Sequence, residues 1–235
     1  MPELTAEELE VLRLSLKVAI WSVVGSLPFA VAAAYVLARS RLPGKTLFDA
    51  AVHLPLVLPP VVVGYFLLLV LGRRGPIGAF LDEHFGIVFS FRWTGAAVAC
   101  AVMGFPLMVR AIRLSLEAVD ERLEAAARTL GAGRLRVLAT ITLPLALPGI
   151  ITGTLLSFAR SLGEFGATIT FVSNIPGETR TLPLAIYTYT QVPNGDAYAM
   201  RLSVIAIVVS LGALLVSEIL ARRATAAIRG RDALG

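Results

Sequence analysis

The sequence has few of the side chains that enzymes and metal sites use. Among its 235 residues there are one cysteine, Cys100, and two histidines, His53 and His84. A lone cysteine excludes a disulfide within one chain, and these three residues lack the spacing of a metal-ligand cluster. No Gly-x-Ser-x-Gly nucleophile elbow is present. We therefore expect no catalytic residue and no metal site, and we interpret Cys100, which lies in an apolar run, as a small buried hydrophobic residue.

Charge is also scarce. Only 16% of the residues are charged and 57% are hydrophobic, whereas soluble domains have about 25% and about 45–50%. Disordered chains need the opposite balance, and one soluble core of this size cannot hide so much apolar surface. The composition therefore predicts an all-α integral membrane protein, because a helix satisfies its own backbone groups inside a bilayer.

A complete phosphate-binding loop is missing as well. Gly44-Lys45-Thr46 resembles the end of such a loop, but Arg39 stands where its first glycine is required. The segment also joins two apolar stretches instead of a strand and a helix. We therefore expect this chain to bind no cofactor, so that any ATP and magnesium would be held by a separate subunit.

Five apolar stretches are long enough to cross a bilayer core, which needs roughly 20 helical residues. They are Leu14–Leu37, Ala50–Leu71, Thr94–Val109 (extendable to Leu114), Leu145–Val172 and Ala199–Ala221. Leu182–Val192 is too short and is typical of a half-helix buried in protein. Thr5 and Glu8 have the spacing of a capping box, which predicts a helix start at about residue 6. We predict one transmembrane domain over residues 1–235, with five full helices and a half-helix that can be counted as a sixth.

The basic residues predict how these helices are oriented. With five crossings, 13 of the 21 Lys and Arg residues fall on one side of the membrane. They are Arg39, Arg41, Lys45, Arg110, Arg113, Arg122, Arg128, Arg134, Arg136, Arg222, Arg223, Arg229 and Arg231. Because basic loops stay in the cytoplasm, we expect the N-terminus outside and the C-terminus inside.

The longest cytoplasmic loop covers residues 115–144. Apolar residues recur in it at helical spacing, with charged residues opposite, and a glycine pair follows. The apolar set is Leu116, Val119, Leu123, Ala126, Ala127 and Leu130, and the charged set is Asp120, Glu121, Glu124 and Arg128. The pattern predicts a helix, a glycine turn and a second short helix over Arg134–Ala139. Such a helix either rests on lipid or fills a groove in a cytoplasmic partner.

The sequence motif in this loop favours a groove in a cytoplasmic partner. The run Glu124-Ala125-Ala126-Ala127-Arg128-Thr129-Leu130-Gly131, followed after nine residues by Ile141-Thr142-Leu143-Pro144, resembles the signature of type I ABC importer permeases. Glu124 lies one residue before the family's acidic position, which falls on Ala125. The resemblance implies that the loop contacts the ATPase. Its candidate residues are Glu124, Ala125, Ala126, Arg128, Gly131, Ile141, Leu143 and Pro144.

Two further segments are similar to molybdate permeases. They are residues 157–168, with Gly163-Glu164-Phe165-Gly166, and residues 181–187, Thr-Leu-Pro-Leu-Ala-Ile-Tyr. The resemblance implies two copies of this chain in a prokaryotic inner membrane, two ATPase subunits inside and an oxyanion-binding protein outside. The implied cargo is molybdate, with tungstate as a second oxyanion. Sulfate or thiosulfate permeases are the alternative. An ATP-independent channel or carrier and a structural scaffold are rivals that leave the loop signature unexplained.

Ionisable residues at membrane depth are functional candidates by default. Arg160 and Glu164 lie one turn apart in the fourth stretch, among the hydroxyl residues Thr154, Ser157 and Ser161. One interpretation is a self-neutralised pair that holds the helix end. The other is a translocation pathway in which Arg160 guides a divalent anion and Glu164 keeps its affinity low, as transport requires.

Overall fold

The structure is a computed structural model that describes residues 5–40 and 43–232, without the side chains at 217, 218, 221 and 224–232. Arg41 and the side chains of Arg229 and Arg231 therefore lie outside the described part. Within that part the chain forms helices and turns and no strand, as predicted. The helices are α1 (Ala6–Arg39), α2 (Lys45–Val57), α3 (Pro60–Leu71), α4 (Pro76–Phe85), α5 (Trp93–Glu117), α6 (Glu121–Thr129), α7 (Arg134–Val137), α8 (Leu143–Leu162), α9 (Gly166–Val172), α10 (Leu182–Thr190) and α11 (Asp196–Asp232), with a π-helical turn at Leu138–Thr142 before α8.

The start of α1 confirms the predicted capping box. The Glu8 amide donates to Thr5 Oγ1 at 3.3 Å, and the Thr5 amide donates to Glu8 Oε2 at 2.9 Å. These two bonds satisfy amides that the first helical turn leaves free. Glu8 is buried, and its Oε1 also accepts from Arg201 Nε of α11 at 2.6 Å. The start of the first helix is thereby tied to the last one.

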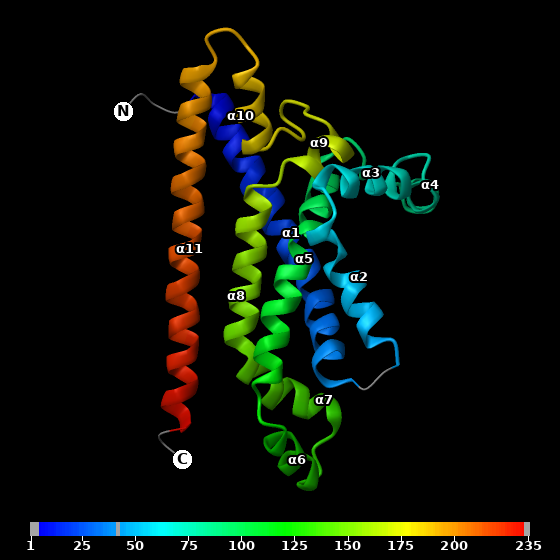
Figure 1. Ribbon diagram of the computed structural model, residues 1–235, viewed down its shortest axis with the longest axis vertical. Coiled ribbons are helices and arrows are strands. Elements are labelled where there is room, and N and C mark those ends of the chain that lie inside the picture. The colour runs from blue at the N-terminus through cyan, green and yellow to red at the C-terminus, as the bar shows by residue number, and fades with distance from the viewer. Residues whose placement is uncertain (1–4, 41–42, 233–235) are drawn as a thin grey trace.

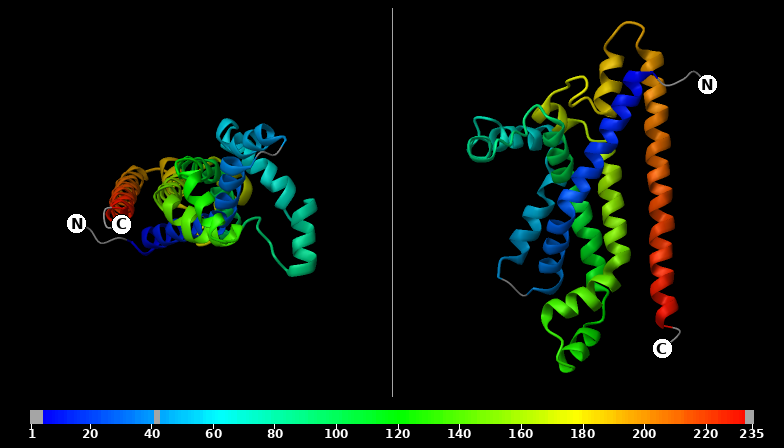
Figure 2. Two further views of the ribbon diagram at one scale, coloured as in Figure 1. Left: turned by 90° about the horizontal axis from the view of Figure 1, so that it is seen from below. Right: turned by 180° about the vertical axis from the view of Figure 1, so that it is seen from behind.

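The core of the molecule is formed by α1, α5 and α8, with α5 between the other two (Figures 1 and 2). In its most apolar window α5 is 61% buried, whereas α11, which packs on α8 from one side, is 11% buried. Small residues let α5 and α8 approach closely, because a Cβ at Gly153 would lie 2.8 Å from the Met108 carbonyl oxygen. Much of the apolar surface of α11 is left exposed, as lipid contact requires.

The second apolar stretch differs from the prediction. Ala50–Leu71 does not form one full helix, because α2 and α3 meet at Leu58–Pro59 with a bend of 113°. Pro60 begins α3, and a proline there can start a helix but has no N–H to donate to a carbonyl of the preceding turn. At about 1.5 Å per residue the 13 residues of α2 extend about 20 Å, and α3 then lies across the end of the bundle, leading to α4 (Figure 1).

The fourth stretch is also shorter than predicted. Leu145–Val172 breaks after Leu162, where α8 ends, and the chain turns at Gly163 before α9 begins. α9 packs against α3, where a Cβ at Gly64 would lie 2.5 Å from the Ala167 carbonyl oxygen. α10 is the expected half-helix and ends at Thr190.

Four continuous helical segments in the described part are long and apolar enough to cross a membrane, and the bent α2–α3 pair adds a fifth if it counts as one span. The four are α1, α5, the continuous run from α7 through α8, and α11. Figure 1 shows α6 and α7 at the end of the bundle where α1 and α5 finish, and α9 and α10 at the opposite end. The two loop helices are therefore separated from the half-helix by the length of the bundle.

Candidate functional site

The loop over residues 115–144 has the predicted form of a helix, a glycine turn and a helix. Gly131 follows α6 with a φ of +84°, in the left-handed region. Its amide donates to the Arg128 carbonyl at 3.0 Å, and the Ala132 amide donates to the Ala127 carbonyl at 3.0 Å. These two bonds make a Schellman motif, which satisfies the last carbonyls of a helix and needs a residue that tolerates positive φ. Gly131 thus fixes the angle between α6 and α7.

The predicted apolar stripe is divided between two surfaces, which corrects the sequence interpretation. Leu116 and Val119 are buried against the membrane helices. Leu123 is 50% exposed and Leu130 is 88% exposed. The helical periodicity does not continue from Leu116 to Leu123, because α5 ends at Glu117 and a turn precedes α6. Leu123, Leu130 and Leu135, which is 81% exposed, are the large exposed apolar residues of the loop, and we call these three leucines the loop face.

Glu124 does not lie on the charged outer side where its spacing placed it. Its side chain is only 7% exposed and its carboxylate points toward the membrane helices. Oε1 lies 3.1 Å from Arg39 Nη2 and accepts from Thr142 Oγ1 at 3.0 Å, and Oε2 accepts from Arg128 Nη2 at 3.3 Å. Glu124 faces inward because its main partner, Arg39, belongs to α1 and is distant in the sequence.

The other loop candidates are spread over both sides of the loop. Ala125, Ala126, Arg128, Gly131 and Pro144 are exposed. Ile141 and Leu143 are half-buried at the junction of the π-helical turn and α8. The exposed candidates are therefore accessible to a partner, whereas Ile141 and Leu143 are partly covered where the loop joins α8.

Two of the candidate pathway serines lie in a polar seam between α1, α5 and α8. Ser161 Oγ is 3.0 Å from Ser22 Oγ of α1 and donates to the Ser157 carbonyl at 2.8 Å. Ser157 is buried where α8 passes Gly104 of α5. Cys100 is buried beside them, as predicted, with Sγ 3.6 Å from the Ser161 carbonyl oxygen. In this arrangement Ser157 and Ser161 join helices within the chain.

Arg160 and Glu164 form the ion pair that their spacing predicts. Arg160 Nη1 lies 2.7 Å from Glu164 Oε2, and the side chains are 28% and 1% exposed. Glu164 Oε1 also accepts from the Ala167 amide in the first turn of α9 at 2.8 Å. The carboxylate thus holds the corner between α8 and α9 while one side of Arg160 stays accessible. Thr154 lies apart from this pair and donates to the Ile150 carbonyl at 2.7 Å.

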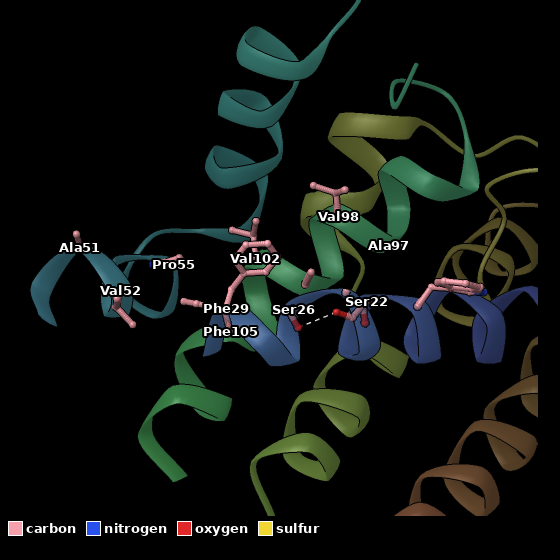
Figure 3. Close-up of a pocket in the computed structure, with 13 residues that line it drawn as sticks. Ser22, Ser26, Phe29, Ala51, Val52, Pro55, Ala97, Val98, Val102 and Phe105 are labelled. Carbon is pink, nitrogen blue, oxygen red and sulfur yellow. Dashed lines mark hydrogen bonds between the residues drawn. The ribbon is translucent and has the colours of Figure 1, made fainter. Parts of the chain in front are cut away.

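A groove of about 610 Å³ opens between α1, α2 and α5 (Figure 3). Phe29, Val102 and Phe105 point into it, and nearly all of its lining is apolar. The hydroxyls of Ser22 and Ser26 are the polar groups at its wall, and both donate to carbonyls of α1. Apart from the indole N–H of Trp21, the side chains that line the groove offer an oxyanion no donor that is not already bonded within α1, so the groove suits a hydrocarbon chain or an apolar helix.

A second groove, of about 530 Å³, lies between α2 and α5 near the loop, and we did not predict it from the sequence. Arg113 Nη1 is 2.9 Å from Asp49 Oδ2, and Arg113 Nε is 2.7 Å from Glu117 Oε1. His53 Nδ1 is 3.0 Å from Asp49 Oδ1, and Arg110 completes the charged wall. The i, i+4 spacings of Asp49 with His53 and of Arg113 with Glu117 are the signals that could have revealed it.

Comparison with known proteins gives relatives that match nearly the whole chain. The molybdenum transport system permease protein ModB of Escherichia coli (strain K12) is 64% identical over 219 residues, which are 93% of this chain and 96% of that protein. The protein of the same name from Haemophilus influenzae is 56% identical over 216 residues, 92% of this chain and 94% of its own length.

The fold is also found in a solved transporter. A bacterial alginate ABC transporter, crystallised in complex with an alginate pentasaccharide-bound periplasmic protein, aligns with a TM-score of 0.73 at 16% identity. The alignment covers 93% of this chain and 80% of that one. A family model, described as the binding-protein-dependent transport system inner membrane component, matches residues 26–226. The chain therefore belongs to the family of inner membrane components of binding-protein-dependent transport systems.

Proposed function

We propose that this chain is the transmembrane subunit of an ATP-driven ABC importer for an oxyanion, with molybdate as its cargo and tungstate as a second substrate. The observation that carries the proposal is the 64% identity, over 96% of its length, to a permease protein named for molybdenum transport. The exposed loop face at the end of the bundle supports the same conclusion, because a subunit without its own nucleotide site must receive motion from a partner.

Three kinds of partner follow from this proposal. A second copy of the chain completes the translocation pathway, and two cytoplasmic ATPase subunits hold ATP and magnesium, so this chain binds neither. A binding protein delivers the oxyanion from outside. The alginate transporter with its bound periplasmic protein supports a delivery protein for folds of this kind. The loop face, formed by Leu123, Leu130 and Leu135, is the surface that we assign to the ATPase.

In the bacterial plasma membrane we propose five crossings, with the N-terminus outside and the C-terminus in the cytoplasm. The helices α1, α5 and α11 run from the α10 end toward the loop end, and α2 and α8 run back (Figure 1). The exposed arginines of the loop, Arg122, Arg128, Arg134 and Arg136, support a cytoplasmic position for that end. In this orientation α3 would lie near the outer surface. The second crossing would then be made by α2, and α3 would complete it at the outer side.

For the pathway we propose the stretch of α8 that carries Thr154, Ser157, Arg160, Ser161 and Glu164. The half-accessible guanidinium of Arg160 can attract a divalent oxyanion, while its bond to Glu164 reduces the attraction. Because Ser157 is buried against α5 and Ser161 is bonded to α1, they would reach the cargo only in a state in which α8 moves away from these two helices.

Reconstitution of transport tests the proposal. The chain would be purified with its ATPase and binding protein and placed in liposomes, and molybdate uptake would be followed with ATP inside. We expect uptake that needs all three components and ATP, and that excess tungstate but not sulfate inhibits. Strong inhibition by sulfate would move the cargo to the sulfate and thiosulfate class. Uptake without ATP would instead indicate a channel or carrier.

The loop face gives a direct prediction. Leu130→Ala and Leu135→Ala should each weaken binding of the ATPase by about tenfold, because each removes apolar surface worth about 1–2 kcal/mol when buried. Binding would be measured with purified permease in detergent and labelled ATPase. Leu215→Ala is the matched control, since Leu215 is 63% exposed on α11. Unchanged affinity in both loop variants would refute the assignment of this face.

A further inference from the structure

Arg39, the last residue of α1, is bound into the cytoplasmic loop. Its side chain is only 10% exposed. Nη2 donates to the Val119 carbonyl at 2.9 Å, and Nη1 donates to Glu121 Oε1 at 2.9 Å. Nη2 also lies 3.1 Å from Glu124 Oε1. One guanidinium therefore holds the turn before α6 and the first turns of α6 itself, a geometry that its planar set of donors suits.

Glu124 extends this contact to the fourth transmembrane segment. The same oxygen that faces Arg39 accepts the Thr142 hydroxyl, and Thr142 is buried in the last position of the π-helical turn before α8. A buried carboxylate is costly to desolvate unless charge and hydrogen bonds compensate it. Here Arg39, Thr142 and Arg128 compensate it together. The buried carboxylate thus links the end of α1, the loop helix and the beginning of α8.

The two sides of α6 consequently have different tasks. The outer side carries Leu123 and continues into the loop face, whereas the inner side carries Glu124 and is bonded to two transmembrane helices. A displacement of α6 must either move the ends of α1 and α8 or break a buried charged cluster. The π-helical turn is a natural site for bending, because sharp kinks in helices often occur at such turns.

We propose that Arg39, Glu124 and Thr142 are positioning residues that transmit movement of the loop to α1 and α8. This inference rests on the proposed function as an ATP-driven importer. It adds the residues that connect the loop to the transmembrane helices. In this arrangement the ATPase contacts the loop face but not Glu124. The cluster converts a push on α6 into movement of α1 and α8 relative to α5, on which both pack.

The test measures the number of molybdate ions imported per ATP hydrolysed, in liposomes that contain the complete complex. We expect Arg39→Met to lower this ratio by about tenfold while ATP hydrolysis and assembly with the ATPase persist, a size typical of the coupling energy between two sites. Arg39→Lys should recover part of the ratio because it keeps the charge. Thr142→Val should lower it, whereas Thr140→Val, the matched control in the same turn, should not, because the exposed Thr140 donates only to the Arg136 carbonyl.

A double-mutant cycle separates transmission from simple loss of stability. Arg39→Met combined with Glu124→Gln should be no worse than Arg39→Met alone, because both changes interrupt one connection. Multiplying effects would overturn the proposal, as would a normal ratio in Arg39→Met. Loss of ATPase binding in all of the variants, including Arg39→Lys and Thr142→Val, would also overturn the proposal. The cluster would then serve only to keep the loop folded. Absence of uptake in the wild-type complex would refute the proposed function itself, and this inference with it.

Discussion

Replacement of Gly131 by valine is expected to abolish most molybdate uptake while the protein remains folded. Gly131 has a φ of +84°, and a Cβ at this position would have no atom within 4 Å. The penalty is therefore purely conformational. It amounts to about 1–2 kcal/mol for an ordinary side chain and is larger for a β-branched one. The loop can escape this strain only by giving up the Schellman motif, which sets the angle between α6 and α7.

The consequence falls on the loop face, because Leu123 and Leu130 precede the turn and Leu135 follows it. A changed angle moves the two parts of the surface relative to each other, so we expect uptake to fall by at least about tenfold, in line with the loss of more than 1.4 kcal/mol at an interface. Gly131→Ala should be intermediate. The control is Gly133→Ala, because Gly133 has a φ of −67° and equally open surroundings. Normal uptake per ATP in Gly131→Val would contradict the role of the turn.

Gly149→Leu is expected to have the largest effect on stability. A Cβ at Gly149 of α8 would overlap the Ser115 side chain and lie 2.7 Å from the Ala111 carbonyl oxygen of α5. The Ser115 Cβ and the Ala111 carbonyl oxygen are both held in place by the backbone of α5, so a rotamer change cannot relieve the overlap, and the helices must separate. The bond from Ser115 Oγ to the Ala146 carbonyl would be lost as well. Overpacking of this kind costs about 1–3 kcal/mol or more.

Thermal unfolding in detergent, followed by size-exclusion chromatography, measures this effect. We expect Gly149→Leu to yield little monodisperse protein and a clearly lower midpoint. Gly212→Leu on α11 is the matched control, since a Cβ at Gly212 has no atom within 4 Å and α11 is mainly exposed there. A midpoint for Gly149→Leu equal to that of the wild type would mean that α5 and α8 do not pack as closely as described.

Features encoded by neighbouring residues were predictable from the sequence. The capping box of Thr5 and Glu8, the Gly131 turn and the pair of Arg160 and Glu164 each depend on residues within five positions of one another, and the structure contains all three. The burial of Cys100 followed from its apolar neighbours. Local spacing is informative where the partners lie on the same helix or turn.

The predictions that were wrong concern contacts between distant segments or the position of a break in a helix. Hydropathy alone could not show that Ala50–Leu71 bends by 113°, although Pro59 and Pro60 mark the place. The helical period placed Glu124 outside because it was continued from Leu116 through a turn that resets it. No spacing rule connects Glu124 with Arg39, since their contact exists only after α1 and α5 have packed together.

The burial of Cys100 simplifies the labelling of this protein for measurements of its movement. Its sulfur is enclosed between α5 and α8 near the middle of the seam, and the sequence contains no other thiol. A cysteine introduced at the exposed Thr140, outside the loop face and the Glu124 cluster, would therefore be the sole accessible target for a maleimide spin label, without removal of Cys100. In a symmetric pair of chains, two such labels give one interspin distance. That distance would follow the loops through the ATP cycle in an otherwise unaltered polypeptide.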